Sequence, residues 1–213
     1  MRRTFSVRDR PETDTDARFC AMPAIGWGGT QVADAVRMKL RAASGFTLIE
    51  LLIVVSIIGV LAAVAIPGVL RARMAANESS ALASLRAINS GQVSYSSSCA
   101  YGGYAVDLAD LSLAPGGANQ GFISPDLNVN GVTKSGYIIG LAAETGAVPM
   151  GAAGLTCNVS ANNPVGAYWA NADPLTPNST GTRFFATDTR GSMFWALGAT
   201  IGNPIPAGTS AVQ

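Results

Sequence analysis

The sequence predicts an α+β protein in which a long amino-terminal helix, membrane-spanning in its first half, packs against a small antiparallel β-sheet. Two observations lead to this prediction. An apolar run at residues 46–66 is followed by apolar residues at helical spacing through residues 67–98. In residues 99–213, short apolar runs alternate with glycine, proline and asparagine. Because a helix and a sheet each bury one apolar face, we expect the sheet to form a head on the second half of the helix.

Residues 1–45 differ in composition from the rest of the chain and are expected to be a leader peptide. They hold eight of the 14 basic and five of the 13 acidic residues, which leaves six bases, eight acids and a net charge of −2 in the remainder. Met38 is followed by Lys39 and Arg41, a short positive segment that keeps this end cytoplasmic under the positive-inside rule. We expect translation to start at Met38 and residues 1–37 to be an upstream extension. A genuine long leader is the alternative.

Residues 46–66 form an apolar run of 21 residues, close to the roughly 20 that a helix needs to cross a bilayer. Glu50 is the one charged residue in the run. A carboxylate inside such a span costs roughly 2.5–3.5 kcal/mol on insertion scales, so it is by default a functional residue with a partner. A cut after Gly45 would create an amine at Phe46, which a neighbouring copy could offer to Glu50. The alternative is an ordinary signal peptide cleaved after Ala65, but its apolar region would be shorter and free of acid.

Residues 67–98 are expected to continue the helix as an amphipathic segment. Pro67 removes a backbone donor and clashes with the preceding turn, so a kink is expected there. Gly59 weakens the helix in mid-span, or permits close packing of helices. Apolar residues then recur on one face, and charged residues are expected on the other faces. The apolar set is Leu70, Met74, Ala81, Leu85 and Ile88, and the charged set is Arg71, Arg73, Glu78 and Arg86.

The strongest strand candidates are rich in aromatic or β-branched residues and bounded by turn formers. They are residues 136–141, 167–170, 183–187 and 192–197. The last two are joined by a predicted hairpin turn from Asp188 to Gly191, in which glycine permits positive φ. A long loop is expected at residues 101–131. Core packing, rather than an adhesive or electron-carrying role, is expected of Tyr95, Tyr101, Tyr104, Tyr168, Trp169 and Trp195.

The three cysteines become a pair once the leader is removed. Cys20 lies in the leader, and Cys99 and Cys157 remain, an even number that suits an oxidising compartment. A disulfide between them would stabilise the head by roughly 4 kcal/mol in the chain-entropy model. Two free thiols are the alternative. A metal site is less favoured, because neither cysteine belongs to a CxxC pair and the chain has no histidine.

The composition disfavours catalysis and the binding of cofactors, metals or nucleic acid. Without histidine, no Ser-His or Cys-His pair can form, and the glycine patterns of nucleotide-binding loops are missing. Asp107 and Asp110 are expected to be a solvated pair, and the loops around Asp173 and Asp188 offer too few carboxylates for Ca²⁺. Specific nucleic-acid binding usually needs a clustered basic patch, which this weakly charged chain lacks. We therefore expect no catalytic residue, no cofactor and no metal.

The stretch Gly45-Phe-Thr-Leu-Ile-Glu50, with the apolar helix behind it, resembles the class III signal of type IV pilins and of the pseudopilins of type II secretion. In that superfamily a membrane peptidase cuts after the glycine, the new first residue is N-methylated, and the glutamate guides addition of the next subunit. The resemblance implies that Gly45 is the cleavage residue, Phe46 the methylated terminus and Glu50 the assembly residue. It also implies a pilin-like fold whose helix melts between Gly59 and Pro67 on assembly.

The resemblance further implies a structural subunit that polymerises with copies of itself into a type IV pilus. Its partners would be the prepilin peptidase, the pilus or type II secretion assembly machinery and the inner membrane, which it would leave for the filament at the cell surface. One rival is a pseudopilin, which would stay periplasmic. The other is a minor, tip-located pilin that binds DNA or surfaces. The chain departs from many pilins in one respect, because its candidate disulfide runs from Cys99 to Cys157 rather than closing a carboxy-terminal loop.

Overall fold

A computed structural model describes residues 45–212, so the predicted leader, the start at Met38 and Cys20 lie outside the described residues. The chain divides into two units, Met1–Phe46 and Thr47–Gln213, and the second is described by itself. It contains a long helix, two short helices and six strands. These are α1 (Leu48–Ser98), α2 (Leu108–Ser112), η1 (Pro125–Leu127), β1 (Val132–Lys134), β2 (Tyr137–Ala143), β3 (Tyr168–Pro174), β4 (Arg183–Asp188), β5 (Met193–Leu197) and β6 (Ser210–Ala211).

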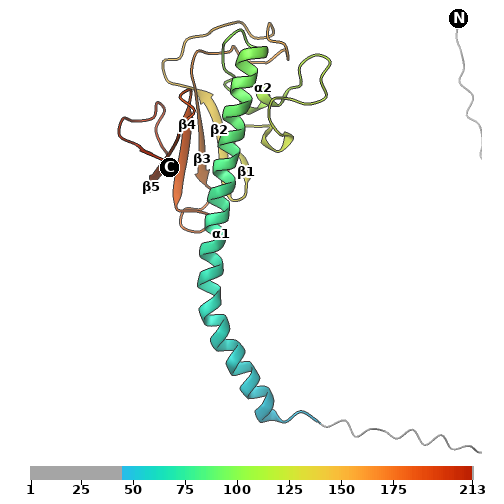
Figure 1. The fold of residues 1–213 in the computed structure, drawn as a ribbon, viewed down its shortest axis with the longest axis vertical. Helices are drawn as coiled ribbons and strands as arrows, with labels where there is room; N and C mark the ends of the chain where they lie inside the picture. The colour runs from blue at the N-terminus through green and yellow to red at the C-terminus, as the bar shows by residue number, and fades with distance from the viewer. Residues whose placement is uncertain (1–44, 213) are drawn as a thin grey trace, which may run out of the picture. The chain divides into compact units, whose positions relative to one another are not determined.

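Helix α1 is one continuous helix of 51 residues. The sequence predicted a kink at Pro67 and a weakened helix between Gly59 and Pro67. Helix α1 is continuous through both residues, and because a continuous helix can still bend at a proline, the kink stays a prediction. A proline inside a helix removes one backbone hydrogen bond, and the turns on either side keep theirs. Figure 1 shows α1 curving in its amino-terminal half without interruption. Melting of this segment on assembly remains a prediction.

The six strands form one antiparallel sheet in which the strands follow each other in chain order from β1 to β6. The predicted strands correspond to β2, β3, β4 and β5, and the α+β prediction is confirmed. The predicted hairpin turn is also present, since Gly191 has a φ of 72° and its N–H donates to the Asp188 carbonyl at 2.8 Å. The prediction missed β1 and β6, which have three and two residues. It also missed α2 and η1 within the expected loop at residues 101–131.

Figure 1 shows the second half of α1 lying on one face of the sheet, and the core residues lie between the two. Alternate residues of β2 and β3 are buried, because successive side chains of a strand point to opposite faces. From α1, Ala81, Leu85 and Ile88 enter the core as predicted, whereas Leu70 is 55% exposed. Leu70 precedes the part of α1 that the head covers. The largest fully buried side chains include Leu85, Ile88, Tyr95, Tyr137, Ile139 and Phe185.

Candidate functional site: the amino-terminal helix and its attachment to the head

The first turn of α1 is capped by a side chain. Thr47 is the N-cap, and its Oγ1 accepts a hydrogen bond from the Glu50 backbone N–H at 3.2 Å. The Thr-x-x-Glu spacing is that of a capping box, which satisfies donors that the start of a helix leaves unpaired. The sequence prediction missed this cap, although the spacing is a helix-start signal. Thr47 therefore fixes where α1 begins and places Glu50 in its first turn.

The Glu50 carboxylate is exposed on an apolar surface. Among residues 45–212 it takes part in none of the side-chain hydrogen bonds or ion pairs. Its neighbours Ile49 and Leu51 are 66% and 60% exposed. The first turn of a helix favours a negative charge, because the partial charges of its free N–H groups are positive. The arrangement presents one carboxylate that has no partner within the described part of its own chain.

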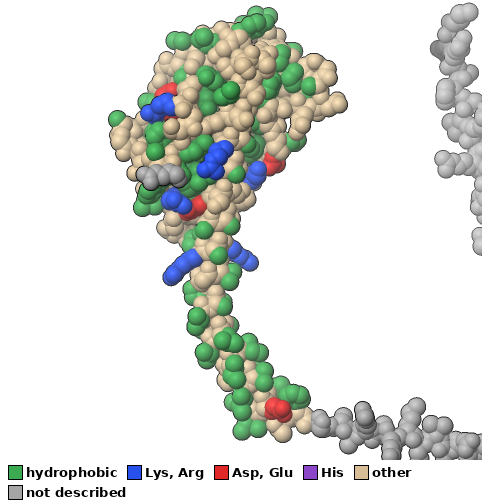
Figure 2. Space-filling view, in the orientation of Figure 1, with side chains coloured by type: hydrophobic (Ala, Val, Ile, Leu, Met, Phe, Trp, Pro, Cys, Tyr) green, Lys and Arg blue, Asp and Glu red, His purple; other side chains and the backbone are tan. Residues whose placement is uncertain are grey.

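The first half of α1 exposes its apolar side chains on all sides. From Leu48 to Leu70, the large apolar residues are 47–80% exposed. Figure 2 shows them in green along this part of the helix, with the red of one acid near its start. The helix is long and apolar enough to cross a membrane, and its apolar window is not buried at all. An exposed apolar surface of this extent marks an interaction site, either with lipid or with another protein surface.

The other predicted residues of this segment are also exposed. Gly45 and Phe46 precede α1 in the chain, and neither is buried. A Cβ atom added at Gly59 would meet nothing within 4 Å, so no contact within the described chain requires glycine there. Close helix packing and local melting therefore both remain predictions for Gly59. A shallow apolar hollow of about 240 Å³ on the same stretch of helix is lined by Ser56, Ile57, Val60 and Leu61.

The second half of α1 is attached to the sheet by an ion pair. Glu78 Oε2 accepts a hydrogen bond from Arg183 Nε at 2.8 Å and lies 2.6 Å from Arg183 Nη2. Glu78 Oε1 accepts from the N–H and Oγ1 of Thr182 at 2.9 and 3.0 Å, and from the Arg183 N–H at 3.3 Å. The prediction that Glu78 lies on a different face of the helix from the apolar residues was wrong, since Glu78 is buried beside them. The Glu78 side chain is 7% exposed, because its partner Arg183 meets it from β4, 105 residues further along the chain.

The surroundings of Glu78 lower its pKa. Burial by itself would raise the pKa, but hydrogen bonds from Thr182 and Arg183, together with the Arg183 charge, outweigh it. An acid whose pKa is lowered by folding binds fewer protons in the folded state than in the unfolded state. Its contribution to stability is therefore present above the unfolded pKa and is lost as the pH falls through the folded pKa. The attachment of α1 holds at neutral pH and weakens in acid.

Helix α1 ends at a covalent bond. Cys99 is the C-cap and is joined to Cys157 by a disulfide, with the two Cα atoms 4.7 Å apart. The Cys157 N–H also donates to the Cys99 carbonyl at 3.2 Å. Cys99 is buried and Cys157 is exposed. The pairing is the one predicted from the cysteine count, and it ties the end of the helix to the middle of the head.

Asp107 and Asp110 are not the solvated pair that the sequence predicted. Asp107 is the N-cap of α2, and its Oδ1 accepts from the Ala109 N–H at 2.8 Å. Asp110 is 2% exposed. Its two carboxylate oxygens accept from the Ala161 N–H and from Asn162 Nδ2, both at 2.9 Å. Buried backbone groups of irregular loops need hydrogen-bond partners, and Asp110 supplies one by fastening α2 to a distant loop.

Asp188 and Asp173 are held by contacts within the head. Asp188 pairs with Arg190 across the β4–β5 turn, at 2.6 Å. Asp173 Oδ2 accepts from Asn171 Nδ2 and Thr200 Oγ1, both at 2.8 Å, while its Oδ1 is buried without a partner. Burial raises the pKa of Asp173, and the two hydrogen bonds only partly offset this effect. Within residues 45–212, no three histidine, cysteine, aspartate or glutamate side chains gather where they could hold a metal ion.

Core packing holds for five of the six aromatic residues and fails for one. The partly buried Trp195 packs against the main core and Trp169 against a smaller one. Tyr95 and Tyr168 are buried, and the half-buried Tyr104 packs on Tyr168 with ring centroids 5.0 Å apart. Tyr101 is 79% exposed, and its φ of 54° lies in the left-handed region. The expectation that Tyr101 packs in the core was wrong, because this backbone conformation turns its side chain out of the head.

The amino-terminal segment matches known proteins. Residues 40–66 match the family described as the prokaryotic N-terminal methylation motif. The type IV wide pilus major component PilA4 of Thermus thermophilus is 64% identical over 39 residues, which are 18% of this chain and 30% of that protein. The type IV major pilin protein PilA of Myxococcus xanthus is 49% identical over 51 residues, 24% of this chain and 23% of that protein. No solved structure matches the chain significantly.

The described part of the matched motif, residues 45–66, is largely exposed rather than covered by the head. The chain spans less than a third of the length of the curated relatives it matches. The methylation motif includes Gly45, Phe46, Glu50 and Gly59. In the structure, the long helix that begins within this motif packs with an antiparallel sheet. The motif, the two relatives and this architecture together support the identification of the chain as a type IV pilin-like prepilin.

Proposed function

We propose that the chain is a structural subunit that polymerises into a type IV pilus filament. The prepilin peptidase would cut between Gly45 and Phe46, and the amine of Phe46 would be methylated. Residues 46–66 would hold the subunit in the inner membrane until the assembly machinery adds it to a filament at the cell surface. The observation that carries this proposal is the exposed apolar half of α1, whose lone charge is Glu50. The two relatives named as pilus components support it.

In this proposal, assembly transfers the apolar surface of α1 from lipid to a bundle of sister helices. Lipid tails are as apolar as leucine side chains, so close packing and polar contacts drive the step rather than removal of surface from water. Glu50 sets the register by pairing with the Phe46 amine of a neighbouring copy. N-methylation leaves that amine cationic, so the pair persists. A subunit in the wrong register would leave a buried charge unpaired, at a cost of about 3–5 kcal/mol.

The first experiment compares fibres sheared from cells with the membrane fraction by mass spectrometry of the amino-terminal peptide. We expect an abundant peptide in the fibres that begins at Phe46 and is heavier by one methyl group. The same peptide confined to membranes would contradict the proposal and favour a pseudopilin. A fibre in which this chain is only a trace component would instead indicate a minor, tip-located subunit.

The second experiment replaces the assembly residue. We expect Glu50→Ala to be cleaved and methylated but to reduce fibre yield about tenfold or more, because the neighbouring amine then loses its partner. Glu144→Ala is the control, since this acid follows β2 in the head and takes part in none of the ion pairs within residues 45–212. Its fibre yield should equal that of the wild type. Normal yield from Glu50→Ala would refute the role of Glu50 in assembly.

A further inference from the structure

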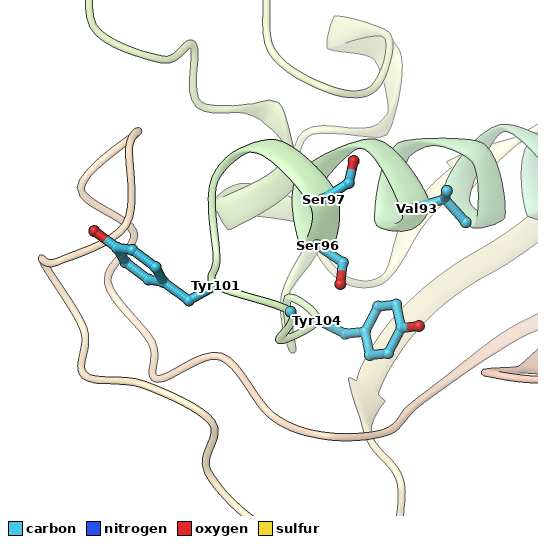
Figure 3. Close-up of a pocket in the computed structure, with 6 residues that line it drawn as sticks. Val93, Ser96, Ser97, Tyr101 and Tyr104 are labelled. Carbon is cyan, nitrogen blue, oxygen red and sulfur yellow. The ribbon is translucent and has the colours of Figure 1, made fainter.

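Tyr101 lies in the loop that follows α1 and has an unusually free side chain. It is 79% exposed, and it belongs to none of the aromatic pairs within residues 45–212. Figure 3 shows its ring projecting away from the last turn of α1 and away from Tyr104. A large aromatic ring held in water is a candidate contact surface.

The backbone at Tyr101 is strained, and its surroundings hold it in that conformation. A φ of 54° is rare for a bulky residue, and Gly102 follows with a φ of 93°. The Gly102 N–H donates to the Ser96 carbonyl at 3.0 Å, and the Gly103 N–H donates to the Ala100 carbonyl at 2.9 Å. A Cβ atom at Gly103 would meet a neighbouring side chain at 2.7 Å, so the loop is also tightly packed. Strain of this kind, maintained by the fold, is characteristic of functional positions.

The chain segment just before Tyr101 is held in place by a covalent bond and by packing. Two residues before it, Cys99 is bound covalently to Cys157. One turn earlier in α1, Tyr95 is fully buried and packs edge-on against Phe122 with ring centroids 5.3 Å apart. A side chain fixed on such a support loses little conformational freedom when a ligand binds.

Tyr101 lines two surface hollows, of about 440 and 330 Å³. Both mix hydroxyl groups with apolar side chains, and neither is lined by a charged residue. Figure 3 shows the first hollow, with the Ser96 and Ser97 hydroxyls at the end of α1. Besides Tyr101, the first is lined in part by Val93, Ser96, Ser97 and Tyr104, and the second by Ser97, Ser98 and Leu155.

We propose that Tyr101 and these two hollows form a binding site for a neutral carbohydrate. One face of a pyranose ring carries C–H bonds that stack on an aromatic ring, and its edge carries hydroxyl groups. The Ser96 and Tyr101 hydroxyls can donate to and accept from those groups, whereas the Ser97 and Ser98 hydroxyls already donate to the Ser94 carbonyl and are left to accept. The lining holds no Lys or Arg to pair with a phosphate or an acidic sugar. The site belongs to the head, so it does not depend on the proposed polymerisation.

The test titrates the full-length protein, in zwitterionic detergent micelles, with lactose, cellobiose and N,N′-diacetylchitobiose. Alkyl maltosides and glucosides are avoided because their head groups are themselves sugars. Saturation-transfer NMR should show one sugar face closest to the protein, and at least one of these disaccharides should bind with a Kd of about 0.1–10 mM. The acidic trisaccharide 3′-sialyllactose should bind no better than lactose.

The decisive variant is Tyr101→Asn, because asparagine tolerates the left-handed backbone conformation. Its melting temperature should equal or exceed that of the wild type, while binding weakens about tenfold or more. Tyr101→Phe keeps the ring and should retain most of the binding. Val148→Asn alters another side chain that is 63% exposed, outside both hollows, and should change nothing. The proposal is overturned if none of the three neutral disaccharides binds, or if Tyr101→Asn binds as well as the wild type.

Discussion

Replacing Glu78 by glutamine tests how α1 is attached to the head. Glutamine retains one acceptor oxygen for the three contacts from Thr182 and the Arg183 N–H, but its NH₂ group would face Arg183 Nε and Nη2. Breaking a buried ion pair costs about 3–5 kcal/mol. The Arg183 side chain is 39% exposed and regains water, which reduces the loss. We expect Glu78→Gln to lower the free energy of unfolding by about 2–3 kcal/mol, which corresponds to a fall in Tm of about 4–12 °C for a protein of this size.

The assay is thermal unfolding of the cleaved chain in micelles, followed by the fluorescence of Trp169 and Trp195 in the sheet. The control is Asp126→Asn, which breaks the exposed ion pair with Lys134 and should cost less than about 1 kcal/mol. The difference between wild type and Glu78→Gln should shrink as the pH falls through the folded pKa of Glu78. Equal losses in the two variants would refute the reasoning, because burial would then add nothing to the Glu78 pair.

Two further predictions concern the head. Replacing both Cys99 and Cys157 by serine removes a bridge between residues 58 apart and should lower the free energy of unfolding by about 4 kcal/mol, measured by urea denaturation; an unchanged midpoint would contradict this. Asp173→Asn should raise stability by about 1 kcal/mol at neutral pH and have little effect in acid. Burial raises the pKa of Asp173 in the folded state, so its contribution is present below the unfolded pKa and is lost as the pH rises through the folded pKa. The measurement is thermal unfolding at pH 3 and pH 8. A melting temperature of Asp173→Asn no higher than that of the wild type at pH 8 would contradict the prediction.

Features that depend on neighbouring residues in the chain were predictable from the sequence. The apolar run, the segment from Gly45 to Glu50, and strands β2, β4 and β5 each have a local pattern. Strand β3 was predicted too short, because Asn171 and Asp173 break the apolar pattern. The structure places both on the same side of β3, alternating with the buried Ala170 and Ala172. A strand with one polar face can therefore be mistaken for a loop when its far end lacks aromatic residues.

Features that depend on distant residues were missed. Glu78 contacts Arg183, which lies 105 residues further along the chain. The spacing of residues along the helix gives no information about that contact. Asp110 is likewise buried by Ala161 and Asn162, about 50 residues further along the chain. The exposure of Tyr101 follows from a backbone conformation that the packed loop and the disulfide impose. In each case the side chain's role is set by a partner that only the folded chain brings near.

The closed loop between Cys99 and Cys157 determines how the subunit would carry a mechanical load. A pull on the free half of α1 enters the head beside Glu78 and follows the helix to Cys99. There the covalent path divides between residues 100–156 and the much shorter disulfide, which bears the tension. Strands β1 and β2 lie within residues 100–156, the path that carries no tension, so their detachment from the sheet would not lengthen the subunit. Within the head, only the chain beyond Cys157, which forms β3 to β6, could lengthen the subunit by unfolding, and the disulfide thus limits how far a loaded head can stretch.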